Sequence, residues 1–371
     1  MTVATTPIQA RRLLRELVRP LERVVSLYLG LRPDTPTLDT TEDLDLRWRA
    51  IAVDLLAQGT PPALVEALTR RLASATAEPT EVALFAANDE VLLHQELPGA
   101  VPFDDARFAA PARVLPVLTW LARHPAHVVV VADRTGAEVT AVEAGSVAGR
   151  TETIVGPDDE IERNAPGGWS QPRYQRRAED SWRHNAAAVA DATQRALHRV
   201  SADLLLVAGD VRAVQLLEER LRGQLDRRVA IHRLPGGRQP DGSEPARRVA
   251  VAEQIAAHVA QANGSLLERF DAERGPHGRA VDGVAQTLEA LAAGRVETLL
   301  IVDNPADERR AWFGPDLLCV DDPSQTGRPV DGLRDGRLVD VAVRAALLTD
   351  AEVRVVDAGP SEGIGALCRF S

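Results

Sequence analysis

The chain has 371 residues, a formal net charge of −11 and 45% hydrophobic residues. This length predicts two or three globular domains, and the acidic balance argues against a protein that binds nucleic acid through a uniformly basic surface. The sequence contains no lysine, which excludes a phosphate-binding loop of the G-x-x-x-x-G-K-[ST] type.

Neither cysteine, Cys319 or Cys368, has the spacing of a metal site, and no apolar run is long enough to cross a membrane. The first residues lack the charged-then-apolar pattern of a secretory signal. We therefore expect a cytoplasmic protein with no metal, no other cofactor, and neither a membrane nor DNA as a partner.

The first 123 residues predict an N-terminal α/β domain. The pattern of apolar residues there indicates, in chain order, a helix over 7–19, a strand over 23–31, helices within 35–59 and 61–75, and a hairpin over 81–98.

Residues 124–264 predict a central domain in which strands and helices alternate. Its expected elements are a strand pair within 127–145, a helix over 178–200, a strand over 203–210, a helix over 211–225, a strand over 228–234 and a helix over 246–262. This alternation favours a mixed, mostly parallel sheet, from which we expect a Gly-Gly-Trp-Ser-Gln loop to protrude.

Residues 265–371 predict a C-terminal α/β/α domain. We expect a helix over 280–294, strands over 296–303 and 316–322, a helix over 338–350, and strands over 352–359 and 363–370. The whole chain is thus predicted to be an α/β protein of three domains.

The stretch APGGWSQPRYQRRAEDSWRHN (165–185) gathers positive charge in an acidic chain. Residues 163–183 hold five arginines and two acids, a local charge of +3. Arginine suits phosphate oxygens and stacks on bases, and Trp169 and Tyr174 add planar side chains. A surface loop before an ordinary helix explains the same residues, so composition alone leaves both interpretations open.

This stretch also carries a family resemblance. Gly167-Gly168, Gln171, Arg173-Tyr174-x-Arg176 and Arg183-His184-Asn185 resemble the central domain of the eukaryotic and archaeal class-one release factors and of Pelota. Residues 290–304 and 351–370 are similar to the third domain of that family, so the resemblance covers about 125–371. It is strongest to the bacterial branch, which includes actinobacterial release-factor-like proteins and ribosome hibernation factors of the Balon type.

The resemblance implies a translation factor that enters the A site of the bacterial 70S ribosome and contacts 23S and 16S rRNA. Its central loop would reach the peptidyl-transferase centre, and its third domain would contact a translational GTPase, which in this branch is elongation factor Tu; tRNA is a further possible partner. The implied RNA-binding residues are Gly167, Gly168, Trp169, Ser170, Gln171, Arg173, Tyr174, Arg176, Arg177, Arg183 and His184.

The sequence departs from the release-factor pattern in two ways. Trp169-Ser170 separates the glycines from Gln171, and a displacement of about 1 Å at a reaction centre can lower a rate about 100-fold. A chain without lysine also cannot carry the Asn-Ile-Lys-Ser loop that reads stop codons. We therefore expect a non-catalytic factor that occupies the A site of idle or stalled ribosomes during hibernation or stress.

Two alternatives stay open. Gly168-Trp169-Ser170-Gln171 keeps the glycine-x-x-glutamine spacing of relatives that cleave the tRNA end, so Gln171 could serve a peptidyl-tRNA hydrolase or a tRNA-end nuclease. The third class is a cytosolic adaptor that binds a GTPase through its last domain.

Overall fold

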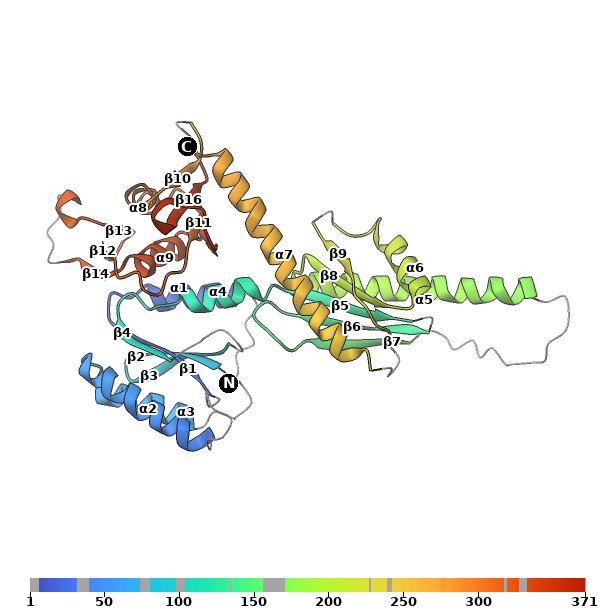
Figure 1. Cartoon of the computed structure of the whole chain (residues 1–371), viewed down its shortest axis with the longest axis horizontal. Coiled ribbons are helices and arrows are strands. Elements are labelled where there is room, and N and C mark those ends of the chain that lie inside the picture. The colour runs from blue at the N-terminus through green and yellow to red at the C-terminus, as the bar shows by residue number, and fades with distance from the viewer. Residues whose placement is uncertain are drawn as a thin grey trace. The chain divides into compact units, whose positions relative to one another are not determined.

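The computed structural model describes residues 7–31, 40–73, 81–97, 104–133, 135–155, 171–226, 228–238, 242–275, 277–316, 319–326 and 332–370. The chain forms two compact units (Figure 1): residues 1–122 combine with 262–371, and residues 123–261 form the other. The second unit nearly coincides with the predicted central domain. The boundaries of the three predicted domains stay a prediction.

The N-terminal part of the first unit is an antiparallel sheet with helices on both faces. The sheet order is β3-β2-β1-β4. Its elements are α1 (Pro7–Val18), β1 (Val24–Gly30), α2 (Thr40–Ala57), α3 (Pro62–Ala73), β2 (Glu81–Ala87), β3 (Glu90–Glu96), β4 (Asp105–Ala109) and α4 (Leu115–Arg123).

Strand β1 is almost wholly apolar because both of its faces are covered. Val25, Leu27 and Leu29 join a core with the residues of α2 and α3, whereas Val24 and Tyr28 join the core that contains α1 and α4. Successive side chains of a strand point to opposite faces, so a strand between two layers needs apolar residues at nearly every position.

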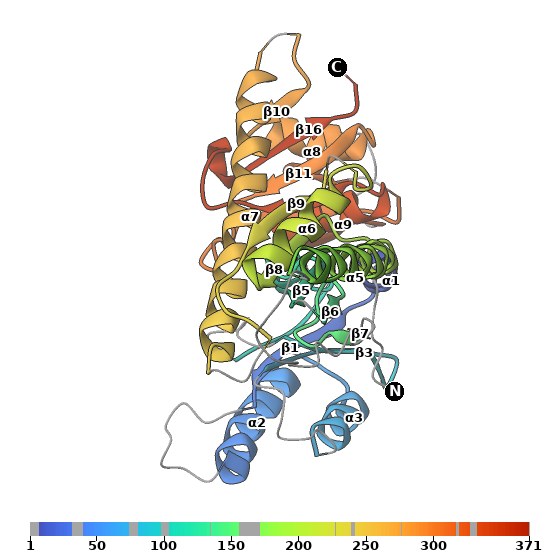
Figure 2. The same ribbon diagram turned by 90° about the vertical axis from the view of Figure 1, so that its right-hand side faces the viewer.

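The C-terminal part of the first unit has the predicted α/β/α layers (Figure 2). Its main sheet has the order β10-β16-β11-β15, and a second sheet has the order β13-β12-β14. The elements are the end of α7 (Glu244–Ala272), β10 (Ala280–Asp282), α8 (Val284–Ala292), β11 (Val296–Ile301), β12 (Arg310–Phe313), β13 (Cys319–Val320), β14 (Arg334–Arg337), α9 (Leu338–Leu348), β15 (Glu352–Val355) and β16 (Ile364–Cys368), with short 3₁₀ turns at Pro323–Thr326 and Ser361–Gly363.

The two parts of the first unit share one hydrophobic core, in which α1 and α9 pack together. Arg344 of α9 is 1% exposed. Its guanidinium donates to the carbonyl oxygens of Val18 (3.0 Å) and Arg19 (3.3 Å), at the C-terminal end of α1, and to that of Asp316 (3.2 Å). A helix end leaves its last carbonyls unbonded and carries a partial negative charge, so a buried cation is favourable there.

The second unit is a five-stranded mixed sheet of order β7-β6-β5-β8-β9. Helices α5 and α6 cover one face, and the beginning of α7 covers the other. The remaining elements are β5 (His127–Ala132), β6 (Gly136–Val142), β7 (Arg150–Val155), α5 (Gln171–Val200), β8 (Leu204–Gly209), α6 (Val211–Leu221) and β9 (Ala230–Arg233). The predicted mixed sheet is confirmed, but it is not mostly parallel, because β5–β8 and β8–β9 are parallel pairs whereas β5–β6 and β6–β7 are antiparallel.

The sequence patterns did not reveal every element. Strands β4, β7, β12 and β14 and helix α4 were not predicted, and the predicted helix over 280–294 begins with strand β10 instead. Gly283, at φ +85°, separates β10 from α8, because this backbone conformation fits neither element. Among the described residues no helix is both long and apolar enough to cross a membrane.

Gly209 ends β8 at a point where no side chain fits. Its φ is +132°, and a Cβ added there would lie 1.8 Å from the carbonyl oxygen of Ala132 on β5. Because that oxygen belongs to the backbone of a central strand, we expect Gly209→Ala to lower the free energy of unfolding by at least about 2 kcal/mol. Urea unfolding measures the loss. Gly223→Ala is the control, since a Cβ there has no neighbour within 4 Å; equal effects of the two substitutions would contradict the steric explanation.

Candidate nucleic-acid interface

The basic segment forms the beginning of helix α5. This helix starts at Gln171, seven positions before the predicted start at residue 178, and Pro172 fits its first turn because proline needs no hydrogen-bond acceptor there. The positions of Arg173, Arg176 and Arg177 are therefore helical. Residues 156–170, which include the predicted site residues Gly167, Gly168, Trp169 and Ser170, lie outside the described part of the chain.

The helical repeat brings most of the predicted basic positions to one side of α5. At 3.6 residues per turn, positions 173, 176, 177, 183 and 184 fall within an arc of about 120°, together with the acid at 180. Positions 171 and 174, which hold Gln171 and Tyr174, fall outside this arc. We call positions 173, 176, 177, 183 and 184 the basic face of α5.

The opposite side of α5 packs against the sheet. Its buried residues recur at helical spacing and contact β5, β6 and α6; they are Ala186, Val189, Ala190, Thr193, Ala196, Leu197 and Val200. The side chains of Arg183 and His184, by contrast, are exposed. The packing of α5 therefore leaves Arg183 and His184 on the side of the helix that faces away from the sheet.

Asn185 differs from its two neighbours because it points inward. It is 5% exposed and lines a small cavity with Asp133, Ala186 and Ala213 at the carboxyl end of β5. The volume of about 10 Å³ suits about one water molecule, which is far too little for a substrate. Of the Arg183-His184-Asn185 motif, two residues thus face solvent and the third belongs to the core.

The carboxyl ends of the parallel strands β5 and β8 carry Asp133 and Asp210, at the edge where α/β sheets often bind ligands. Here both carboxylates have structural partners. Asp133 accepts from the backbone N–H groups of Thr135 (2.7 Å) and Gly136 (2.9 Å), and Asp210 caps α6 by accepting from Arg212 (3.0 Å) and Ala213 (3.2 Å). No group of three or more metal-ligating side chains occurs in the part of the chain that the structure describes.

Comparison with known proteins places the central segment in a family. Residues 126–276 match the bacterial archaeo-eukaryotic release factor family 2. Two proteins of Mycobacterium tuberculosis, MT2704 of strain CDC 1551 and Rv2629 of strain H37Rv, are each 27% identical over 371 residues, with 96% of both chains covered.

The solved structures with similar chains include the archaeal translation termination factor aRF1, at 17% identity over 99% of each chain and a TM-score of 0.23. Ribosome-bound archaeal Pelota has 14% identity over 99% of this chain and 95% of its own, with a TM-score of 0.39. Dom34 of S. cerevisiae has 8% identity over 97% of this chain and 92% of its own, with a TM-score of 0.38.

The family match begins just before β5 and ends just beyond α7, so it contains nearly all of the second unit, including the basic face of α5. The narrower resemblance to hibernation factors of the Balon type stays a prediction. Residues 126–276 are similar to the bacterial archaeo-eukaryotic release factor family 2, which confirms the predicted resemblance to release-factor and Pelota-like proteins.

Proposed function

We propose that this protein binds the bacterial 70S ribosome and occupies the A site of idle or stalled ribosomes as a hibernation or stress factor. In this proposal the segment around Gly167, Gly168, Trp169, Ser170 and Gln171 reaches the peptidyl-transferase centre. Arg173, Arg176, Arg177, Arg183 and His184 contact ribosomal RNA, and Tyr174 adds a planar contact. The C-terminal domain is the expected contact for elongation factor Tu.

The basic face of α5 is the observation that carries this proposal. Its net charge is positive in a chain of net charge −11, and it lies opposite the side of α5 that packs on the sheet. A helix that presents arginines every three or four residues can follow an RNA backbone, because each guanidinium can pair with a phosphate. The acidic remainder of the chain limits binding to other RNA.

Sedimentation with purified 70S ribosomes at a series of salt concentrations tests the proposal. We expect the wild-type chain to sediment with ribosomes and the triple variant Arg173→Ala, Arg176→Ala, Arg177→Ala to bind more weakly. If all three arginines pair with phosphates, the slope of log affinity against log salt should also become shallower by about 2–3.

The matched control replaces three exposed arginines in the same unit, Arg212 and Arg220 of α6 and Arg222 directly after it. It changes the net charge equally, so equal loss of binding in both triple variants would indicate bulk electrostatics rather than the basic face of α5. A wild-type chain that stays in the supernatant at modest salt would contradict the proposal itself.

Substitution of Gln171 distinguishes a protein that only occupies the ribosome from one that catalyses a reaction there. As the first residue of α5, its backbone is fixed by the helix, while Trp169-Ser170 lengthens its connection to the glycines. We expect ribosomes with labelled peptidyl-tRNA to keep both the peptide and the tRNA end when the protein is added. Rapid release that Gln171→Ala abolishes would instead establish a peptidyl-tRNA hydrolase or a tRNA-end nuclease.

A further inference from the structure

The first unit contains a large cleft between its N-terminal and C-terminal parts. Its volume is about 990 Å³, at the upper end of the range for small-molecule sites. One wall comes from β4, the loop after it and the β2–β3 turn; the other comes from β12, β14 and the first turn of α9. This cleft lies outside the basic face of α5 and outside the segment that matches the release-factor family.

Arginine is the most frequent charged residue of the cleft. Five arginines line it against four acids; they are Arg23, Arg107, Arg310, Arg334 and Arg337, with Glu22, Asp89, Asp335 and Asp340. Arg334 is exposed and has no ion-pair partner among the described residues. The Arg107 and Arg310 side chains are 52% and 57% exposed, and each pairs with a single carboxylate, that of Asp105 or Asp335. Exposed pairs of this kind are weak, so both guanidinium groups can turn to a bound anion.

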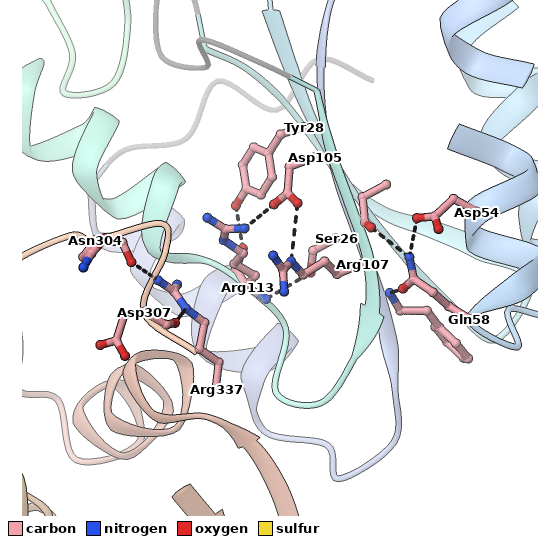
Figure 3. Close-up of polar contacts among 12 residues, drawn as sticks. Ser26, Tyr28, Asp54, Gln58, Asp105, Arg107, Arg113, Asn304, Asp307 and Arg337 are labelled. Carbon is pink, nitrogen blue, oxygen red and sulfur yellow. Dashed lines mark hydrogen bonds and ion pairs between the residues drawn. The ribbon is translucent and has the colours of Figure 1, made fainter. Parts of the chain in front are cut away.

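The first turn of α9 and the end of β14 hold two buried polar atoms without partners. Asp340 is 6% exposed, and its Oδ1 accepts no hydrogen bond. Arg337 donates through Nη2 to the carbonyl oxygen of Asn304 (2.7 Å) and through Nε to that of Asp307 (2.9 Å), but its buried Nη1 has no acceptor (Figure 3). A buried donor or acceptor left unbonded is unfavourable, so the cleft holds one unmet acceptor and one unmet donor.

Arg113, two residues beyond the cleft-lining Pro111, is held in place by the fold. Arg113 is 8% exposed; its backbone N–H donates to the hydroxyl of Ser26 (3.0 Å) and its carbonyl oxygen accepts from the hydroxyl of Tyr28 (2.5 Å). Its guanidinium pairs with Asp105, which Arg107 also contacts at 3.4 Å (Figure 3). Arg113 is therefore a fixed part of the fold, whereas Arg107 is available to a ligand.

We propose that this cleft binds a nucleotide, with its phosphate against Arg107, Arg310 and Arg334 and a base amino group against Asp340. Guanidinium forks match phosphate oxygens, and a carboxylate accepts hydrogen bonds from a base amino group. Leu21, Pro61, Phe108 and Pro111 add apolar lining for a ring. The nucleotide is either free or part of a single-stranded RNA. A free nucleotide would bind the cleft independently of the proposed ribosomal function. Only a nucleotide of RNA would connect the cleft with that function.

Calorimetric titration of the full-length chain, free of ribosomes, tests the proposal with two matched pairs of ligands. AMP and IMP differ in one amino group on the base, as do CMP and UMP. We expect at least one amino-bearing nucleotide to bind about tenfold more tightly than its partner, because the carbonyl oxygen that replaces the amino group repels a carboxylate. Inorganic phosphate should bind more weakly than that nucleotide.

Three variants separate the two halves of the site. Arg334→Ala should weaken nucleotide binding about tenfold, whereas Arg49→Ala, an exposed arginine of α2 outside the cleft, should not change it. Asp340→Asn should abolish the preference for the amino-bearing base while phosphate contacts persist. An unchanged affinity in Arg334→Ala, or mononucleotides that bind the wild-type chain with no preference within either pair, would overturn the proposal.

A single-stranded decaribonucleotide identifies the source of the ligand. If it binds in an Arg334-dependent way and the mononucleotides do not, the cleft takes a nucleotide of RNA. If neither mononucleotides nor the decaribonucleotide bind at millimolar concentration, the cleft is not a nucleotide site. Ribosome sedimentation of Arg334→Ala is measured separately. A cleft that binds no nucleotide would therefore leave the test of the basic face of α5 unaffected.

Discussion

Replacing Arg344 by alanine is expected to lower the free energy of unfolding of the first unit by about 3–5 kcal/mol. The substitution removes three charge-assisted hydrogen bonds to the carbonyl oxygens of Val18, Arg19 and Asp316, and it leaves the buried oxygen of Val18 without this donor. It also opens a cavity beside Phe313, whose ring centroid lies 5.1 Å from the guanidinium carbon. For a unit of this size, calorimetry should record a fall in Tm of roughly 10 °C.

Two further substitutions separate the causes of this loss. Arg344→Met fills most of the volume but makes no hydrogen bond. We therefore expect it to lose well over half of the unfolding free energy that Arg344→Ala loses. Arg344→Lys keeps the charge but cannot reach three carbonyls as the planar guanidinium does, so it should be intermediate. Arg12→Ala serves as the control, because Arg12 lies on α1 with a side chain that is 79% exposed. If Arg344→Ala and Arg12→Ala shift Tm equally, Arg344 does not join the two parts of the unit.

The packing of the N-terminal part of the first unit on its C-terminal part could not be predicted from the sequence. Apolar periodicity located α1 and α9 separately, because each pattern depends only on neighbouring residues. That α1 packs on α9 depends on contacts across more than 300 residues, as between Arg344 and Val18. No local pattern distinguishes a buried arginine from an exposed one, so the sequence did not predict that the N-terminal and C-terminal parts pack into one compact unit.

Local composition also explains the elements that were missed. Strand β4 (DARFA) contains two charged residues and α4 contains a proline at its second position, so neither matches a simple apolar repeat. Helix α5 was predicted to begin late because Arg173-Tyr174-Gln175 reads as polar and irregular. The resemblance to release factors, by contrast, depends on specific residues in sequence order, and the match of residues 126–276 to a bacterial release factor family confirms it.

The residues of the proposed nucleotide cleft escaped prediction for the same reason. Arg107, Arg334 and Asp340 are distant in sequence and belong to no motif, and the turns and strands that carry them meet only in the folded unit. The predicted RNA-binding residues differ, because seven of the eleven lie within one continuous helix. A site formed by neighbouring residues can be predicted from sequence; a site assembled from distant strands cannot.

Replacing Asp340 by asparagine is expected to stabilise the protein at neutral pH. Burial raises the pKa of Asp340 from 3.8 to about 6, and the guanidinium groups of Arg337, Arg113 and Arg107 oppose this rise only in part, while Asp105 adds to it. A shift of about two pKa units corresponds to about 3 kcal/mol. We expect Asp340→Asn to recover about 1–3 kcal/mol of unfolding free energy at pH 7, because the amide is neutral but still needs buried hydrogen-bond partners.

The gain should depend on pH in a defined direction. Below about pH 4 the carboxyl is protonated in both the folded and the unfolded chain, so the ionisation of Asp340 costs nothing. Between about pH 4 and 6 the unfolded chain loses this proton while the folded chain keeps it, and the stability that Asp340 contributes falls as pH rises. Above about pH 6 the folded chain also ionises, and the full cost applies. Urea unfolding of wild type and Asp340→Asn at pH 4, 5, 6 and 7 should therefore show a difference that grows with pH and then levels off.

Asp357→Asn is the control, since Asp357 is exposed in the same unit. Its effect should be small and the same at each pH. A stabilisation by Asp340→Asn that is equally large at pH 4 and pH 7 would mean that the ionised carboxylate is not the source of the cost. A loss of stability at pH 7 would mean that the carboxylate is compensated in the folded chain.

Asp340 lines an arginine-rich cleft, and its carboxylate is unfavourable in the free protein. Ligand-binding sites retain such groups because the ligand supplies the missing partner. Nucleotide binding should therefore narrow the stability difference between wild type and Asp340→Asn at pH 7.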